Sequence, residues 1–85
     1  MYSIMYSKQF WNDVDRVDIE KAEKIVRRID EYLSKDPINL GKPLTGGYRE
    51  CYRYRYGDYR IIYKVLKQEK IIRILGVMHR KEAYR

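Results

Sequence analysis

The chain has 85 residues, 45% of them hydrophobic and 36% charged, which is the composition of one small folded domain spanning residues 1–85. Its apolar runs are a few residues long, far below the ~20 of a bilayer span, and no signal peptide is recognisable, so we expect a cytoplasmic protein without membrane contact. The net charge of +7 comes entirely from residues 48–85, with 11 basic and 4 acidic side chains, because residues 1–47 hold 8 of each.

The N-terminal part predicts one strand and two helices. Tyr2 to Tyr6 has the aromatic and β-branched content of a short strand, and Ser7 is suited to cap a helix after it. That helix would present one apolar face made of Phe10, Trp11, Val14 and Val17. Asp18 is a second candidate N-cap, followed by a helical stripe of Ile19, Ala22, Val26, Ile29 and Leu33. The stripe is too short for a coiled coil, so we expect it to pack on a sheet, with Pro37 ending the helix.

The C-terminal part predicts an antiparallel meander. Residues 35–47 are rich in Gly and Pro and indicate a loop. From Tyr48 the pattern alternates with period two, and Gly57-Asp58 suits a tight hairpin turn. Further strands are predicted at Tyr59 to Leu66 and at Ile71 to Met78. The fold class is therefore α+β: an N-terminal strand, two helices and a three-stranded antiparallel meander, with the helices packed on one sheet face and arginines on the other.

The common catalytic sets are absent from this sequence. No Ser-His-Asp set is recognisable around the single histidine, and one cysteine with one histidine is too little for a metal cage, so no metal or cofactor is expected. Cys51 and His79 could form a nucleophile and base, but a lone strand cysteine is more often a small buried residue. Gly46-Gly47 lacks the residues of a phosphate-binding P-loop.

What remains is a set of cations in residues 48–85, which also hold seven of the ten tyrosines; on the predicted strands the two kinds of residue interleave. Guanidinium groups gathered on a sheet bind phosphate oxygens and stabilise the extra charge of a pentacoordinate phosphorus. RNA supplies its own nucleophile, the 2′-OH, so the protein needs charge stabilisation and groups that move protons. Arg60 and Arg80 are the candidates for stabilisation, and His79 or Tyr84 for proton transfer. The phosphate-binding candidates are Arg53, Arg55, Lys64 and Lys81; the alternative is a plain solvated strand face.

Three segments of the sequence carry a resemblance to a known family: GKPLTG (residues 41–46), YRYRYGDYRIIYKV (52–65) and GVMHRKEAYR (76–85). In these segments the chain resembles the RelE/ParE superfamily of toxins from toxin–antitoxin pairs. RelE-like members cleave mRNA in the ribosomal A site, and ParE-like members inhibit DNA gyrase. The RelE-like branch carries basic residues on the second strand, an arginine on the third, and Arg with Tyr near the C-terminus. The residues here at those places are Arg53, Arg55, Arg60, Arg80 and Tyr84.

The resemblance thus implies a ribosome-dependent endoribonuclease that needs no metal. It also implies a cognate antitoxin whose acidic segment folds along the basic toxin, and operator DNA that is bound only through that antitoxin. Two other hypotheses remain: a gyrase inhibitor, and a basic module that binds RNA without cleaving it.

Overall fold

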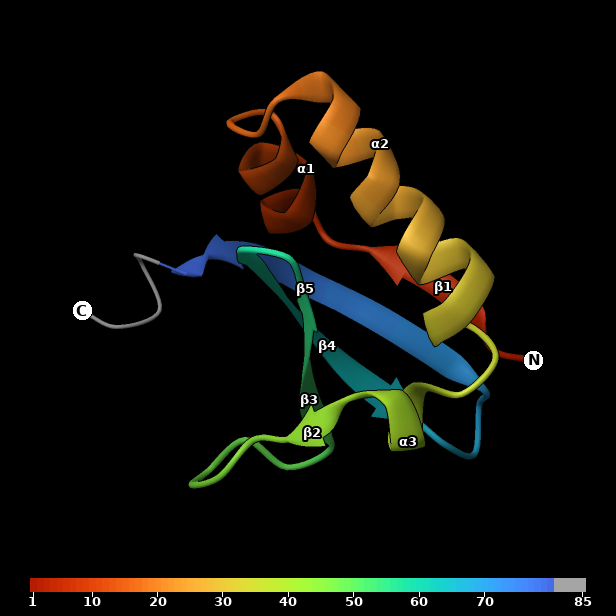
Figure 1. Ribbon diagram of the computed structural model, residues 1–85. Helices are drawn as coiled ribbons and strands as arrows, with labels where there is room; N and C mark the ends of the chain where they lie inside the picture. The colour runs from red at the N-terminus through yellow and green to blue at the C-terminus, as the bar shows by residue number, and fades with distance from the viewer. Residues whose placement is uncertain (81–85) are drawn as a thin grey trace.

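The structure, a computed structural model, describes residues 1–80 (Figure 1). Its elements in chain order are β1 (Ser3–Tyr6), α1 (Lys8–Val14), α2 (Ile19–Arg28), the π-helical turn η1 (Ile29–Leu33), α3 (Pro37–Leu40), β2 (Lys42–Pro43), β3 (Cys51–Tyr56), β4 (Tyr59–Leu66) and β5 (Ile71–His79). None of the helices within these residues is long and apolar enough to cross a membrane.

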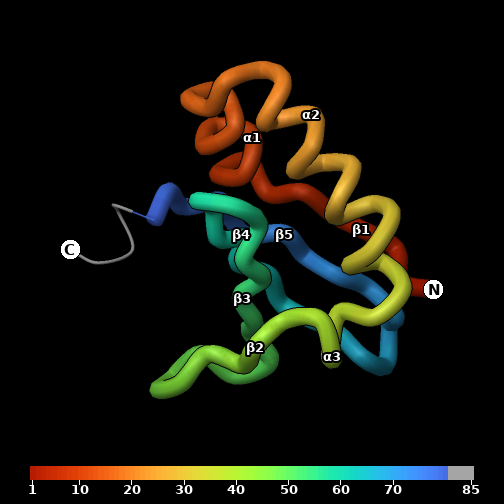
Figure 2. Tube along the Cα trace, in the orientation of Figure 1, coloured from red at the N-terminus to blue at the C-terminus, as the bar shows by residue number. Residues whose placement is uncertain are grey.

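Five strands within residues 1–80 form one mixed sheet in the order β1-β5-β4-β3-β2. β1 runs parallel to β5, and all other neighbours are antiparallel. Figure 1 shows α1 and α2 on one side of this sheet, and Figure 2 follows the chain from α2 through α3 to β2 beside β3. The predicted α+β class, the β3–β4–β5 meander and the helices on one sheet face are confirmed. The strand β2 and the parallel pairing of β1 were not predicted.

The core lies between the helices and the sheet. Ile25, Ile29 and Leu33 are fully buried, and they meet a sheet face formed by Tyr52, Ile61, Tyr63, Val65, Ile72, Ile74 and Val77. The predicted helical stripe therefore packs on the sheet at its C-terminal end. Ile19, at its other end, is 71% exposed and lines an open hollow between α1 and α2.

The first helix begins as the sequence predicts. The Ser7 hydroxyl oxygen accepts a hydrogen bond from the backbone N–H of Phe10 at 3.0 Å, and its O–H donates to the Leu75 carbonyl on β5 at 2.9 Å. Asp18 stands at the N-cap of α2, but its side chain makes no capping hydrogen bond. Ser7 thus fixes both the start of α1 and its position against β5.

The segment from Ser34 to Pro43 differs from the predicted loop. The helical turns end at Leu33, before Pro37, and the Ser34 hydroxyl donates to the Asp30 carbonyl at 2.6 Å. Pro37 begins α3, because proline lacks only an N–H that the first helical turn does not use. The long helix thus ends before Pro37, as predicted, and Asp36 lies outside the α region with φ of −152°; that Pro37 also starts a further helix was not predicted.

The strand β3 begins at Cys51, three residues after the predicted start at Tyr48. Glu50 adopts a left-handed backbone with φ of 63°, which interrupts the extended chain. The N–H of Cys51 donates to the Tyr48 carbonyl at 3.3 Å and closes a turn there. The predicted alternation of side chains consequently applies only from Cys51 onward.

A bulge in β5 sets the direction of its last residues. Ile62 is opposite Gly76 and Tyr63 is opposite Ile74, so Leu75 has no partner on β4. Just beyond it, the N–H of Val77 donates to the Asp13 carboxylate of α1 at 2.8 Å. The bulge is therefore held from the helix side, and it determines which sheet face each later residue of β5 occupies.

Candidate functional site

The arginines of the β3–β4 hairpin lie on the sheet face away from the helices. The residues that alternate with them along β3 and β4 point inward, because Tyr52, Ile61 and Tyr63 are buried in the core. Arg55 is directly opposite Arg60, so the two side chains share the outer face. Lys42 of β2 is opposite Arg53 and joins them there. The strand register thus brings three predicted site residues and one lysine together.

These cations line a hollow of about 260 Å³, which we call the arginine hollow; its walls are Leu40, Lys42, Arg53, Tyr54, Arg55 and Arg60. The residues come from α3, β2, β3 and β4, so the hollow exists only when the short segment after η1 packs beside β3. Lys42 and Leu40 were not among the predicted site residues. The signal that would have pointed to them is the Pro-Ile-Asn-Leu-Gly-Lys-Pro run, which we interpreted as a loop.

Arg80 lies next to the arginine hollow, at the β3–β4 turn. It lines a second, smaller hollow of about 150 Å³ with Arg55, Asp58, Tyr59 and Arg60. Its backbone N–H donates to the Asp58 carbonyl at 2.7 Å. Its guanidinium is 3.8 Å from the Asp58 carboxylate, in a pair whose side chains are 61% and 58% exposed. Because solvent screens such a pair, the backbone hydrogen bond is what locates Arg80.

His79 lies on the opposite, helix-covered face. It is opposite Tyr59 in the sheet, and the two rings meet edge to face with centroids 5.2 Å apart. Both line a hollow of about 220 Å³ with Asp13, Arg16, Val17 and Val77. Successive residues of a strand point to opposite faces, so Arg80 and His79 cannot both join the arginines. The structure therefore separates the predicted proton carrier His79 from the cations it was expected to serve.

The other predicted residues divide into two groups. Lys64 is on the outer sheet face opposite Cys51 and Arg73, four pairs along the β3–β4 ladder from the pair made by Arg60. It extends the basic face but does not line the arginine hollow. Lys81 and Tyr84 lie outside the described residues.

A buried tyrosine holds the segment that completes the arginine hollow. The Tyr63 hydroxyl donates to the Pro37 carbonyl at 2.6 Å, and its ring stacks on Tyr52 with centroids 5.7 Å apart. Burial, with smaller contributions from Tyr52, Tyr54 and Asp36, raises the pKa of Tyr63 far above its ordinary value. A Cβ atom on Gly41 would collide with this hydroxyl. Tyr63 and Gly41 together place α3 and β2, and with them Leu40 and Lys42.

This arrangement suits a phosphate group. Guanidinium groups present several N–H donors in fixed planar geometry and stay charged at any physiological pH. The arginine hollow holds three guanidinium groups, the Lys42 ammonium group and one aromatic side chain, Tyr54. Such a site suits a ligand in which an oxyanion adjoins a ring. Among residues 1–80, no group of three or more His, Cys, Asp or Glu side chains is positioned to hold a metal ion.

Comparison with known proteins decides the family. The family described as "ParE toxin of type II toxin-antitoxin system, parDE" matches residues 4–84. The chain therefore belongs to the RelE/ParE superfamily, as a toxin of a type II toxin–antitoxin pair. The resemblance noted in the sequence is confirmed.

Individual members of the superfamily agree with this assignment over nearly the whole chain. Toxin RelG of Mycobacterium tuberculosis is 26% identical over 84 residues, covering 99% of this chain and 97% of that protein. The crystal structure of the toxin-antitoxin complex RelBE2 from the same organism matches with a TM-score of 0.87 and 25% identity, covering 93% of this chain and 98% of the other. A RelB-RelE antitoxin-toxin complex from Methanococcus jannaschii matches with a TM-score of 0.68 and 30% identity, covering 94% of each chain.

Proposed function

We propose that this toxin is a ribosome-dependent endoribonuclease that cleaves mRNA without a metal ion. The observation that carries the proposal is the convergence of Arg53, Arg55 and Arg60 in one solvent-facing hollow, with Arg80 at its border. A gathering of guanidinium groups of this kind suits a phosphodiester whose negative charge increases in the transition state.

In the proposed reaction the 2′-OH of the nucleotide before the cut attacks the adjacent phosphorus. A bond from O2′ to phosphorus forms, and the bond from phosphorus to O5′ breaks, which leaves a 2′,3′-cyclic phosphate and a free 5′-OH. Arg60 and Arg80 stabilise the non-bridging oxygens, and Arg53 and Arg55 bind the phosphate and its neighbours. One group must accept the 2′-OH proton and one must donate a proton to O5′.

We assign one of these two proton transfers to Tyr84, near the end of the chain, and not to His79; solvent water makes the other. His79 lies on the helix-covered face with Tyr59 and Asp13, so its ring is separated from the arginine hollow by the sheet. Lys64 and Lys81 are proposed as outlying phosphate contacts that guide the RNA.

The test is primer extension on an mRNA translated by purified ribosomes, with the proteins Arg60→Ala, Arg80→Ala and Tyr84→Phe beside the wild type. We expect new 5′ ends with the wild type and a loss of about 10²- to 10³-fold in cleavage rate for each variant. Lys67→Ala, at the far β4–β5 turn, removes one charge and is the matched control. Undiminished cleavage by Arg60→Ala and Arg80→Ala would refute the proposed site.

We further propose that a cognate antitoxin with an acidic segment neutralises the toxin. The relatives from M. tuberculosis and M. jannaschii were solved as toxin-antitoxin complexes, and the charge of +7 favours an acidic partner. Co-expression of a small partner with such an acidic segment should abolish growth arrest, and the two chains should co-purify. Growth arrest that persists with every such partner would contradict this part of the proposal.

A second candidate function is inhibition of DNA gyrase, and the observation in its favour is that the matching family is described as ParE. A supercoiling assay with purified gyrase separates the two. Inhibited supercoiling with intact mRNA would replace the nuclease proposal by this one.

A further inference from the structure

A guanidinium group lies between two tyrosine rings where α2 meets β3. The Cζ atom of Arg28 is 4.5 Å from the ring centroid of Tyr32 and 4.9 Å from that of Tyr56. Tyr32 is in η1, one helical turn after Arg28, and Tyr56 is the last residue of β3. The rings hold the guanidinium plane in place, while the N–H donors at its edge remain directed within the plane. Such a group is preorganised to bind an oxyanion at its edge.

Further cations surround this group. Lys24, Arg27, Arg28, Glu31, Tyr32 and Tyr56 line a hollow of about 290 Å³, which we call the α2 patch. Three cations oppose one carboxylate, so the patch has an excess of two positive charges. Lys24, Arg27 and Glu31 are exposed, and Tyr32 is 49% exposed. The patch therefore combines positive charge with accessible aromatic surface, as single-stranded nucleic-acid sites do.

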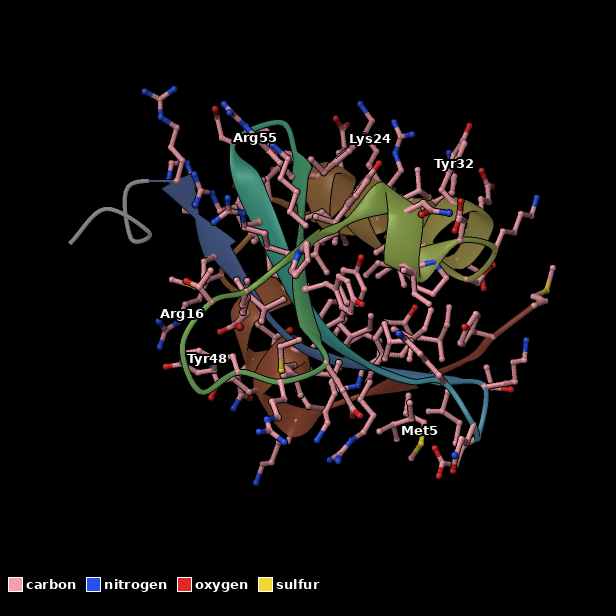
Figure 3. The ribbon with its side chains drawn as sticks, turned by 90° about the horizontal axis from the view of Figure 1, so that it is seen from below. Met5, Arg16, Lys24, Tyr32, Tyr48 and Arg55 are labelled. Carbon is pink, nitrogen blue, oxygen red and sulfur yellow. The ribbon has the colours of Figure 1, made fainter. Side chains whose placement is uncertain are left out.

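The α2 patch and the arginine hollow adjoin each other across β3. β2 pairs only with Tyr52 and Arg53, so within the described residues no strand pairs with the edge of β3 from Tyr54 to Tyr56. Tyr54 lines the arginine hollow and Tyr56 lines the α2 patch, two residues farther along the strand. Figure 3 shows the labelled side chains of Arg55, Lys24 and Tyr32 along the same border of the molecule. A flexible chain could thus pass from one site to the other over this edge.

We propose that the α2 patch is a second phosphate-binding site for the single-stranded RNA whose scissile phosphate occupies the arginine hollow. The RNA backbone crosses the open edge of β3, one phosphate binds Arg28 with Lys24 and Arg27, and a base contacts the exposed part of the Tyr32 ring. This inference rests on the proposed function and extends it to the path of the RNA. RNA is favoured over an acidic peptide because the aromatic rings suit a base as well as the adjoining phosphate.

The experiment measures binding of a short single-stranded RNA that carries 2′-O-methyl sugars and therefore cannot be cut. Fluorescence anisotropy is recorded from about 50 to about 200 mM salt, and the logarithm of affinity is plotted against that of salt concentration. The double variant Lys24→Ala/Arg27→Ala should reduce the magnitude of this slope by about 0.7 for each phosphate contact removed. Near 0.1 M salt, the loss of one contact corresponds to an affinity about five-fold weaker. Lys67→Ala loses charge at the opposite end of β4 and should retain the wild-type slope. If the double variant binds like Lys67→Ala, the inference is refuted.

Tyr32→Leu tests the aromatic part of the α2 patch without changing the charge. We expect it to weaken binding by about two- to five-fold while leaving the salt slope unchanged. Circular dichroism confirms that each variant is folded before its binding is interpreted. Unchanged affinity in folded Tyr32→Leu would exclude the role of the ring.

Arg53→Ala distinguishes failure of this inference from failure of the proposed function. If Arg53→Ala weakens RNA binding and the α2-patch variants do not, only the second site is refuted. If none of these variants changes RNA binding, the proposed function fails as well. Normal RNA binding by the double variant, with weakened binding of an acidic antitoxin peptide, would reassign the α2 patch to the protein partner and overturn the inference.

Discussion

Replacing Tyr63 with phenylalanine removes one buried hydroxyl and leaves its stacked ring. The hydroxyl donates to the Pro37 carbonyl at 2.6 Å, and Tyr63 is fully buried. In the variant the Pro37 carbonyl loses this donor, and no water takes its place at a buried site. An unsatisfied buried acceptor lowers the free energy of unfolding by about 1–3 kcal/mol. For a chain of this size, the melting temperature should fall by about 5–15 °C. Tyr48→Phe, at a position that is 64% exposed, is the control and should change stability by less than about 0.5 kcal/mol.

The same substitution should also change how the free energy of unfolding depends on pH. Burial raises the pKa of Tyr63 in the folded state above the ordinary 10.0, so the folded state favours the neutral phenol. Its stabilisation is complete below about pH 10 and is lost as the pH rises further, because the unfolded chain ionises first. Tyr6, whose pKa is raised by burial and by Asp30, remains in both proteins.

The assay is urea unfolding followed by the fluorescence of Trp11, at neutral pH and at about pH 11. Wild type should lose more stability than Tyr63→Phe over this interval, because the lysines and other tyrosines are common to both chains. Equal losses in the two proteins, or a neutral-pH difference no larger than that of Tyr48→Phe, would refute the reasoning.

Two further substitutions test how α1 is attached to β5. Gly76→Ala would place a Cβ 2.7 Å from the Asp13 carboxylate oxygen and should cost about 1–3 kcal/mol, whereas Gly47→Ala, whose Cβ meets nothing within 4 Å, should be nearly neutral in the same thermal melts. Ser7→Ala removes the acceptor for the Phe10 N–H and should lower the unfolding free energy by about 0.5–2 kcal/mol in urea titrations. Ser7→Thr keeps a capping hydroxyl and should retain most of this stability. Equal stability of Ser7→Ala and Ser7→Thr would argue against the cap.

Local patterns predicted most elements of this fold. The Ser7 cap, the buried stripe ending at Leu33, and the strand Tyr59–Leu66 with its preceding turn at Gly57 all agree with the structure. They were predictable because capping, helical periodicity and positive φ at glycine depend on neighbouring residues. The segment after Ser34 was interpreted as a loop because the brief α3 and β2 are stabilised by partners far along the chain, Tyr63 and Arg53.

The same division holds for the candidate site. Alternation along β3 was enough to put Arg53 and Arg55 on one face, and the short turn was enough to bring Arg60 opposite Arg55. The side of the sheet on which His79 and Arg80 lie depends on the bulge at Leu75, which is held by Ser7 and Asp13 from another element. The contact between the Arg28 guanidinium and the Tyr56 ring likewise joins residues that are far apart in the sequence, so no local pattern predicts it.

The amino-acid order alone thus determined the basic and aromatic character of the C-terminal strands, because charge and period-two spacing are properties of the chain itself. Only tertiary packing decided that Lys42 completes the arginine hollow, that His79 lies on the other face, and that α2 adds a second cationic surface beside β3. The physical reason is that strand register and helix docking are set by long-range contacts among buried side chains, which leave no periodic pattern in the local sequence.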